Sequence, residues 1–263
     1  MLPLFLNQTR YDEFIAELRE HASNLSGKRI LDTGCGYGMM LTHSRLNYEL
    51  DVYGVEPSKH DYEGRFEIAQ LLLADNGLDP SLIQCGTGEH MPFADSSFDI
   101  VYSFQVLEHV RDPRRVLMES WRVLKPGGVL YCNAPNYRTF WEGHYNIPWI
   151  PGIPKPLAKL YVRLLGRNPD YLDHLNFLSQ PQLERWLNEI CGFPVRSDFG
   201  LESWLNRMRS PVFSPYTNPT LIRGVRIADH LGILRLLALL GRWLKWQDML
   251  RVAIRKPHTE SAA

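Results

Sequence analysis

Apolar positions along the first half of the chain follow two different spacings. One is helical: Tyr11, Phe14, Leu18 and Ala22 fall on one face, so residues 11–22 are predicted to form a helix. The other is a short apolar run ended by glycine, proline or asparagine, which is typical of a buried strand. Such runs predict strands at 29–31, 51–55, 82–85, 98–104 and 129–133. Helical spacing between them predicts helices at 39–47, 62–75 and 114–124.

Strands that alternate with helices require a mostly parallel sheet with helices on both faces. The predicted fold is therefore α/β, Rossmann-like and doubly wound, with residues 1–136 as its core. Beyond the core we predict a lid insert rich in proline and aromatic residues, a return to the core sheet and a helical extension, at residues 137–176, 177–200 and 201–263. Within the insert and the return we expect helices at 157–165 and 180–190 and a strand at 193–199.

Composition and charge narrow the function classes. The 29 basic and 29 acidic residues cancel, so no nucleic-acid partner is expected. The four cysteines lie far apart with no CxxC pair, which indicates a reducing compartment. The N-terminus has no basic region or cleavage site of a signal peptide, and no run of 18 uncharged apolar residues is present. We therefore expect a cytoplasmic protein.

The basic residues concentrate near the end of the chain. Between Arg223 and Lys256 there are eight basic and two acidic residues. Their spacing over residues 229–256 predicts an amphipathic helix, or two with a break near Gly241. This helix could pack on its own domain or on a second copy in a homodimer. Alternatively it could attach to an anionic membrane from the inner face, which would favour a lipid-linked substrate.

A glycine-rich turn follows the first predicted strand. The segment Asp32-Thr33-Gly34-Cys35-Gly36-Tyr37-Gly38 runs directly into a predicted helix, and glycines there let the backbone approach a ligand. Glu56 ends the second strand, where a carboxylate can accept hydrogen bonds from two ribose hydroxyls. A nicotinamide dinucleotide would require a glycine where Met39 stands, so we disfavour that cofactor.

Four blocks in order resemble the class I S-adenosylmethionine-dependent methyltransferases, especially the group that includes the ubiquinone-biosynthesis O-methyltransferases. The blocks are the glycine segment 31–38, Glu56, residues 86–110 (Gly-Thr-Gly-Glu-His-Met-Pro-Phe through Leu-Glu-His-Val), and residues 122–128 (Arg-Val-Leu-Lys-Pro-Gly-Gly). Together they cover residues 25–135. Each block alone is weak, and the set is specific.

The resemblance implies S-adenosylmethionine as cofactor and assigns its contacts. Asp32 and the glycines would hold the methionine end, Glu56 the ribose, Thr87 to Glu89 the adenine, and the end of the fourth strand the methyl pocket. The implied cofactor residues are Asp32, Gly34, Cys35, Gly36, Gly38, Glu56, Pro57, Thr87, Gly88, Glu89, Phe104 and Gln105. Arg10 or Tyr11 could also reach the cofactor carboxylate, unless the first helix serves only for packing. Many members of the family have Asp-Ala where this chain has Thr87-Gly88, so a hydroxyl or a backbone carbonyl would replace the acidic contact.

A hydroxyl acceptor benefits from a general base, which is most often histidine. Three histidines qualify by position: His109 after the fourth strand, His144 after the fifth, and His174 within the insert. Each also has a purely structural interpretation. Glu108, Glu142, Asp170 and Asp173 show no tight metal-ligand spacing, so no metal site is predicted.

These features predict a methyltransferase that methylates a hydroxyl of a small molecule or of a lipid- or sugar-linked intermediate. Methylation of a carbon atom of a lipid, for which His144 need not act as a base, is an alternative. A noncatalytic cofactor-binding or membrane-associated partner protein is another. The aromatic residues of the insert would form a lid that excludes water from the substrate.

Overall fold

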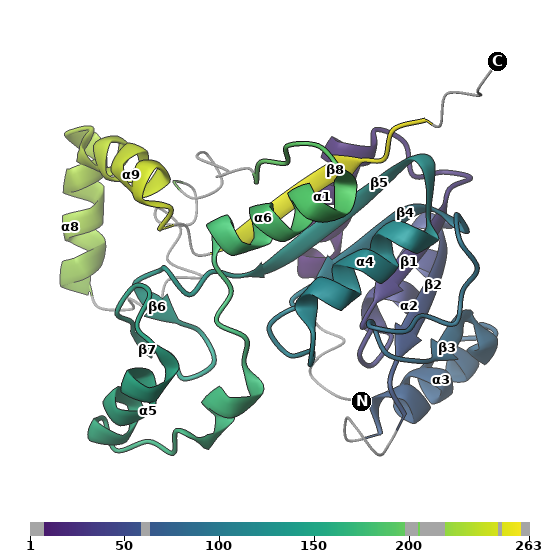
Figure 1. The fold of residues 1–263 in the computed structure, drawn as a ribbon, viewed down its shortest axis with the longest axis horizontal. Helices are drawn as coiled ribbons and strands as arrows, with labels where there is room; N and C mark the ends of the chain where they lie inside the picture. The colour runs from purple at the N-terminus through teal and green to yellow at the C-terminus, as the bar shows by residue number, and fades with distance from the viewer. Residues whose placement is uncertain (1–7, 59–63, 198–204, 206–218, 247–248, 259–263) are drawn as a thin grey trace. The chain divides into compact units, whose positions relative to one another are not determined.

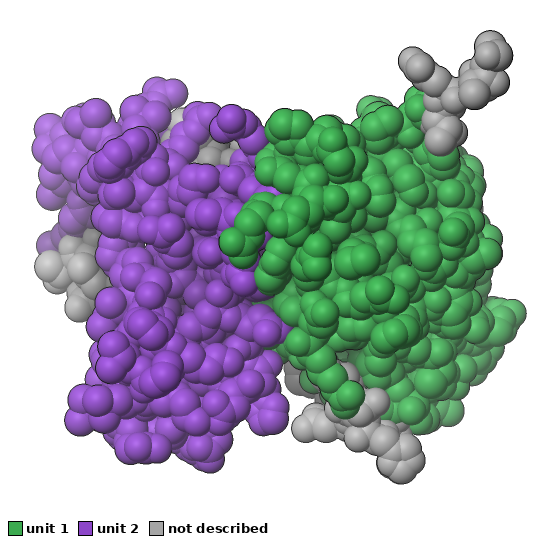
Figure 2. All heavy atoms as spheres, in the orientation of Figure 1, with its two compact units in different colours: residues 1–133, 185–195, 252–263 green, residues 134–184, 196–251 purple. Residues whose placement is uncertain are grey.

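The computed structural model describes residues 8–58, 64–197, 205, 219–246 and 249–258 of the chain. The chain divides into two compact units, which Figure 2 shows in different colours. The first, unit 1, comprises residues 1–133, 185–195 and 252–263. The second, unit 2, comprises residues 134–184 and 196–251.

Unit 1 is built on a six-stranded sheet with the strand order β3-β2-β1-β4-β5-β8 (Figure 1). The strands are β1 (Arg29–Thr33), β2 (Asp51–Glu56), β3 (Ile83–Cys85), β4 (Phe98–Phe104), β5 (Leu124–Pro135) and β8 (Met249–Arg255). The pairs β1–β2, β1–β4, β2–β3 and β4–β5 are all parallel. Because parallel strands have their carboxyl ends at one edge, the loops after β1, β2 and β4 meet there. The predicted Rossmann-like fold is confirmed.

Helices cover both faces of this sheet, as its apolar composition requires. They are α1 (Gln8–Ala22), α2 (Met39–Tyr48), α3 (Arg65–Asp75), η2 (Pro80–Leu82), α4 (Pro113–Val123) and α6 (Gln180–Cys191). Phe14, Leu41 and Leu73 from α1, α2 and α3 share one buried cluster with residues of the sheet. In Figure 1 these helices lie behind the sheet and α4 lies in front of it. Asp112 caps α4, because its side chain accepts a hydrogen bond from the Arg115 amide at 3.0 Å.

The sheet edge beside β5 differs from the prediction. Residues 193–197 are not a strand, so the predicted return strand at 193–199 is wrong for its described part. The edge is occupied by β8, which was predicted to be helical. Burial alternates along β8, with Leu250, Val252 and Ile254 buried, and this is the period of a strand. Backbone hydrogen bonds join Lys256 to residues 127 and 128 at the start of β5.

Unit 2 begins where β5 ends. It contains the antiparallel pair β6 (Trp141–Glu142) and β7 (Ile147–Pro148), the helix α5 (Lys155–Leu164) and the 3-10 helix η3 (Asp170–His174). These elements enclose their own buried cluster, which includes Trp149, Val162 and Leu172. Tyr137 stacks on Phe177 with ring centroids 4.3 Å apart. The aromatic residues of this segment therefore supply a core of their own.

The C-terminal extension of unit 2 contains α8 (Pro219–His230) and α9 (Ile233–Leu244). The helices are separated at Gly232, whose φ of +72° is readily adopted only by glycine, and not at Gly241, which lies buried within α9. Residues 201–218 of the predicted extension lie, apart from Leu205, outside the described residues. Among the helices that the structure describes, none is long and apolar enough to cross a membrane.

Candidate functional site

The loop between β1 and α2 depends on its three glycines. Gly34, Gly36 and Gly38 have φ of +72°, +56° and +71°, a region that other residues rarely adopt. A Cβ atom at Gly34 would lie 2.7 Å from the Val106 side chain, and one at Gly38 would lie 2.9 Å from Ile83. At Gly36 a Cβ atom would meet nothing within 4 Å. The loop is therefore tightly packed at its two ends and open at its centre.

Glu56 supports this loop from the end of β2. Its side chain is buried, and Oε2 accepts a hydrogen bond from the Gly36 amide at 2.8 Å. The amides of Gly34 and Cys35 donate to the Val55 carbonyl, which ties the loop to the same strand. Burial raises the pKa of Glu56, while the Gly36 amide and the Arg65 charge oppose the rise. The loop and this carboxylate thus form one structural unit.

Asp32 lies one residue before the end of β1 and is only 4% exposed. Burial raises its pKa to about 7, the Tyr102 hydroxyl opposes the rise, and the nearby Glu56 charge adds to it. Two acidic side chains therefore lie close to the loop, one of them half-protonated near neutral pH. A buried carboxylate whose pKa is raised in this way is a candidate ligand for a cation.

The loops after β3 and β4 reach the same place. Gly88 lies between α4 and β1, because a Cβ atom there would lie 3.1 Å from the Val116 side chain and 3.4 Å from the Thr33 methyl carbon. At the end of β4, Gln105 adopts a φ of +55° and accepts a hydrogen bond from Arg10 at 3.0 Å. The Arg10 guanidinium also lies over the Phe104 ring, 5.3 Å from its centroid. Such a backbone conformation in a non-glycine residue is often found at binding sites.

The remaining sequence-predicted cofactor residues have structural surroundings of their own. Cys35 is buried, and its sulfur fills the space next to Gly54. Pro57 follows Glu56 directly and is partly exposed. The backbone of Thr87 pairs with His90. The Glu89 carboxylate accepts hydrogen bonds from the amides of residues 111 and 112 and so fixes the loop that precedes α4.

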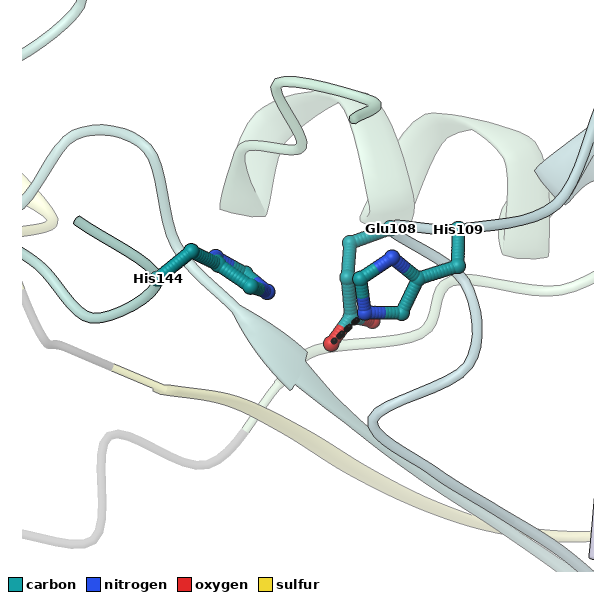
Figure 3. Close-up of side chains that lie close together, drawn as sticks. All are labelled: Glu108, His109 and His144. Carbon is teal, nitrogen blue, oxygen red and sulfur yellow. Dashed lines mark ion pairs between the residues drawn. The ribbon is translucent and has the colours of Figure 1, made fainter. Parts of the chain in front are cut away.

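Glu108 and His109 follow the end of β4 in unit 1. Glu108 is buried, and its Oε1 lies 3.8 Å from His109 Nε2, the ion pair marked in Figure 3. The His109 amide donates a hydrogen bond to the Val106 carbonyl at 2.8 Å. Val106 is the residue that packs over Gly34. His109 is thereby connected to the glycine loop through the backbone of this turn.

His144 of unit 2 is held by a buried carboxylate. Its Nδ1 lies 2.7 Å from Glu142 Oε1, while Glu142 Oε2 accepts a hydrogen bond from the Tyr145 amide at 2.6 Å. Burial alone would raise the pKa of Glu142, but the His144 and Tyr145 hydrogen bonds outweigh it and the pKa lies below its usual value. An ionised carboxylate only accepts hydrogen bonds, so Nδ1 of His144 carries the proton and Nε2 is the acceptor of the neutral ring.

His174 has a different environment. It is exposed at the end of η3, and its ring lies 6.5 Å from that of Tyr171. The neighbouring Asp173 forms an ion pair with Lys159 at 2.7 Å. The carboxylate contact of His144, 2.7 Å to Glu142, is shorter than the 3.8 Å between His109 and Glu108, and it has the arrangement that orients a general base.

Comparison with known proteins shows which family the segment with the glycine loop resembles. A family model described as "Methyltransferase domain" matches residues 31–132. The chain carries a class I S-adenosylmethionine-dependent methyltransferase domain. The predicted family and its cofactor, S-adenosylmethionine, are thereby confirmed.

Two curated relatives are named ubiquinone biosynthesis O-methyltransferase. The one from Erwinia tasmaniensis is 27% identical over 172 residues, which are 65% of this chain and 64% of that protein. The one from Vibrio cholerae is 32% identical over 117 residues, which are 44% of this chain and 46% of that protein. The chain thus spans less than two thirds of the length of either relative. A solved phosphoethanolamine N-methyltransferase 2 from Haemonchus contortus, in complex with S-adenosylmethionine, has the same fold, with a TM-score of 0.58, 16% identity and coverage of 94% of this chain and 53% of that one.

The methyltransferase domain fits its cofactor in two respects. The open space over Gly36 leaves room for a ligand at the centre of the loop. The buried Asp32 carboxylate has the charge that suits a cationic amino-acid end. The sequence did not reveal that Glu142 binds His144, although the Glu-x-His spacing was visible. Nor did it reveal that Asp12 and Asn47 hold the His43 ring, an arrangement that fastens α1 to α2.

Proposed function

We propose that the protein is an S-adenosylmethionine-dependent O-methyltransferase that acts on a hydroxyl of a small molecule or of a lipid- or sugar-linked intermediate. The observation that carries this proposal is the Glu142–His144 pair, because a hydroxyl nucleophile needs a group that takes its proton. The names of the curated relatives support transfer to oxygen. Asp173 and His174, which lack such an arrangement, are assigned no role in the chemistry.

Unit 1 would hold the cofactor. When bound, S-adenosylmethionine supplies a methyl group on a sulfonium, which makes the methyl carbon electrophilic and the departing thioether neutral. We assign Asp32 to the cationic methionine end and Glu56 to the ribose hydroxyls. Burial raises the pKa of Glu56, but hydrogen bonds donated by the ribose hydroxyls would favour its ionised form. Gly34, Cys35, Gly36 and Gly38 would form the cradle, with Pro57 beside it. The adenine would lie along Thr87, Gly88 and Glu89, and the methyl group near Phe104 and Gln105.

His144 would act as the base. With its Nδ1 proton directed to Glu142, it would take up the hydroxyl proton at Nε2, and the ionised Glu142 carboxylate would stabilise the imidazolium that forms. Holding the nucleophile in line with the methyl group accounts for much of the remaining rate enhancement, since such positioning is worth about 7–11 kcal/mol. Glu142 is a positioning residue in this scheme.

The cofactor half is tested by calorimetry. We expect saturable S-adenosylmethionine binding to the wild-type protein and a loss of at least about tenfold in affinity for Glu56→Ala, because hydrogen bonds to a carboxylate are strong. The matched control is Glu20→Ala, an exposed glutamate of α1. Thermal melting of each variant separates a lost ligand from a lost fold. Absence of binding to the wild-type protein would refute the proposal at its first step.

The catalytic half is tested by mass-spectrometric detection of S-adenosylhomocysteine release with phenolic, sugar and lipid hydroxyl acceptors. We expect His144→Gln to lower kcat by about a hundredfold or more and Glu142→Gln to lower it less, because a general base typically contributes 10²–10⁴-fold. His174→Gln is the matched control. Turnover that survives in His144→Gln would favour methylation of carbon. Bound cofactor with no transfer to any acceptor would favour a noncatalytic protein.

A further inference from the structure

The helix α9 exposes most of its apolar side chains. Trp243 is 75% exposed and Leu236 is 67% exposed. The other exposed large apolar residues of this helix are Ile233, Leu237, Leu239 and Leu240. Proteins that remain free in water rarely leave a contiguous apolar surface of this kind uncovered. The surface therefore indicates a binding partner.

The exposed residues of α9 form one continuous face. At about 100° per residue, the side chains from Leu239 through Trp243, Leu236 and Leu240 to Leu237 cover a sector of roughly 160°. Leu234, Ala238 and Gly241 are the buried residues, and they form a separate narrow strip on the other side. The helix thus packs inward through Leu234, Ala238 and Gly241 and presents most of its large apolar residues to the outside. An amphipathic helix that packs on its own domain normally does the reverse.

Basic residues border this face. Arg235 and Arg242 fall next to Leu239 around the helix, and both are exposed. The preceding helix α8, which packs against α9 (Figure 1), adds the exposed Arg223 and Arg226. The stretch 219–246 contains five basic residues and one acidic residue. Lys245, at the end of α9, forms an ion pair with Glu184 at 3.2 Å.

We propose that α8 and α9, the tail hairpin, dock on the surface of an anionic phospholipid membrane. The apolar face of α9 enters the boundary between headgroups and acyl chains, Trp243 lies at that boundary, and the arginines reach the lipid phosphates. A second copy of the chain would cover the same leucines, but it would bring four exposed arginines against four others. Anionic headgroups instead neutralise them, and this charge complementarity favours the membrane. The inference goes beyond the proposed function and does not depend on methyl transfer.

Vesicle flotation of the whole 263-residue chain tests the proposal. The probes are vesicles of phosphatidylcholine alone and of phosphatidylcholine mixed with phosphatidylglycerol, at low and high salt. The test variant is Leu236→Glu/Leu240→Glu, which changes two exposed residues and leaves the buried strip of α9 intact. The matched control is Ile68→Glu/Leu71→Glu, two exposed apolar residues of α3 in unit 1. A third variant, Arg235→Gln/Arg242→Gln, isolates the charge contribution.

The wild-type protein and the α3 control are expected to float with the anionic vesicles, and less so at high salt. The leucine variant is expected to lose at least about tenfold in vesicle affinity, because two leucines no longer enter the apolar layer. The arginine variant is expected to lose about fivefold per charge removed. Failure of the wild-type protein to float with anionic vesicles, or equal binding by the leucine variant, overturns the proposal. A lipid-free dimer in sedimentation, dissociated by the leucine variant and without vesicle binding, would instead assign the face to a second copy.

Discussion

Replacing Asp32 with asparagine isolates the electrostatic contribution of the carboxylate beneath the glycine loop. The two side chains have the same shape, so the buried site keeps its volume and loses only the charge and the titration. Because burial raises the pKa of Asp32 to about 7, the wild-type protein holds a charge there above neutral pH that the surroundings oppose. Asparagine removes this unfavourable charge. The variant is therefore expected to be more stable than the wild-type protein without cofactor, and to bind cofactor less well.

The magnitude follows from the difference between the two pKa values. In the unfolded chain Asp32 has the ordinary value of 3.8, and in the folded protein it has a value of about 7. Between these values the folded state binds more protons than the unfolded state, so the free energy of unfolding falls as the pH rises through this window and is level above it. Three units correspond to ~4 kcal/mol. At about pH 8 the variant should exceed the wild-type protein by up to that amount, or on the order of 10 °C in Tm.

Cofactor affinity should respond to pH in the opposite direction. If the ionised Asp32 binds the cationic methionine end, affinity follows the ionised fraction, which rises from about one tenth at pH 6 to about nine tenths at pH 8. The wild-type Kd for S-adenosylmethionine should therefore tighten about tenfold over this range. Asp32→Asn should bind more weakly at every pH and show no such slope.

Scanning calorimetry and titration calorimetry at several pH values measure both effects. Asp75→Asn, an exposed aspartate at the end of α3, is the matched control and should follow the wild-type protein in both. The reasoning is refuted if Asp32→Asn is no more stable than the wild-type protein above neutral pH. It is also refuted if the wild-type affinity does not change with pH.

Two further perturbations probe the scaffold around the site. Gly36→Ala should reduce stability by only about 1–2 kcal/mol, the strain of a positive φ, yet lower S-adenosylmethionine affinity in calorimetry, because its methyl group enters the open space. Gly34→Ala should be the more destabilising of the two in denaturant titration, because its methyl group would lie 2.7 Å from Val106. A larger loss of stability for Gly36→Ala would contradict the packing described. Arg122→Met should lower the free energy of unfolding by roughly 2–4 kcal/mol. The reason is that the Arg122 guanidinium donates hydrogen bonds to Glu119, Asp95 and two backbone carbonyls. The matched control is Arg114→Met, which removes an exposed ion pair with Glu189 and should cost less than about 1 kcal/mol.

The strands β1 to β5 of the central sheet could be predicted because each of them has a local signal, whereas β8 was predicted to be helical. The predicted bounds of 98–104 coincide with β4. The start of α4 has the usual local signals of a helix N-terminus, with Asp112 as the N-cap and Pro113 as the first helical residue. The glycine spacing and Glu56 predicted that the loop and this carboxylate belong together, and in the structure the Gly36 amide donates a hydrogen bond to Glu56. These signals lie within a few residues of the feature that they specify.

The elements that the sequence misplaced depend on contacts between distant residues. The run Met249–Arg255 carries basic residues at helical spacing and apolar residues at alternate positions, so both interpretations were open. The free edge of β5 selects the strand, and Lys256 secures it through hydrogen bonds to the carbonyls of Trp121 and Leu124. In the tail, either Gly232 or Gly241 could have separated two helices. Leu234 and Ala238 of α9 share a buried cluster with Leu205, and Gly241 is buried on the same side of this helix, so the break falls at Gly232.

The same dependence on distant contacts explains why the sequence indicated the two acidic residues at the loop but not the change in their pKa values. Asp32 lies one residue before the end of β1 and Glu56 ends the neighbouring strand β2, so the parallel register brings their carboxylates beneath one loop. Both have raised pKa values, and only Glu56 has a hydrogen bond from the loop, to the Gly36 amide. The folded protein therefore holds Asp32 in a state that a positive ligand stabilises and that water does not. Without a ligand, the buried negative charge of Asp32 makes the protein less stable than an uncharged side chain at this position would. A bound cation offsets that cost, so the same buried charge increases affinity for the cation. Stability without cofactor and affinity for it are thus opposite consequences of one buried carboxylate.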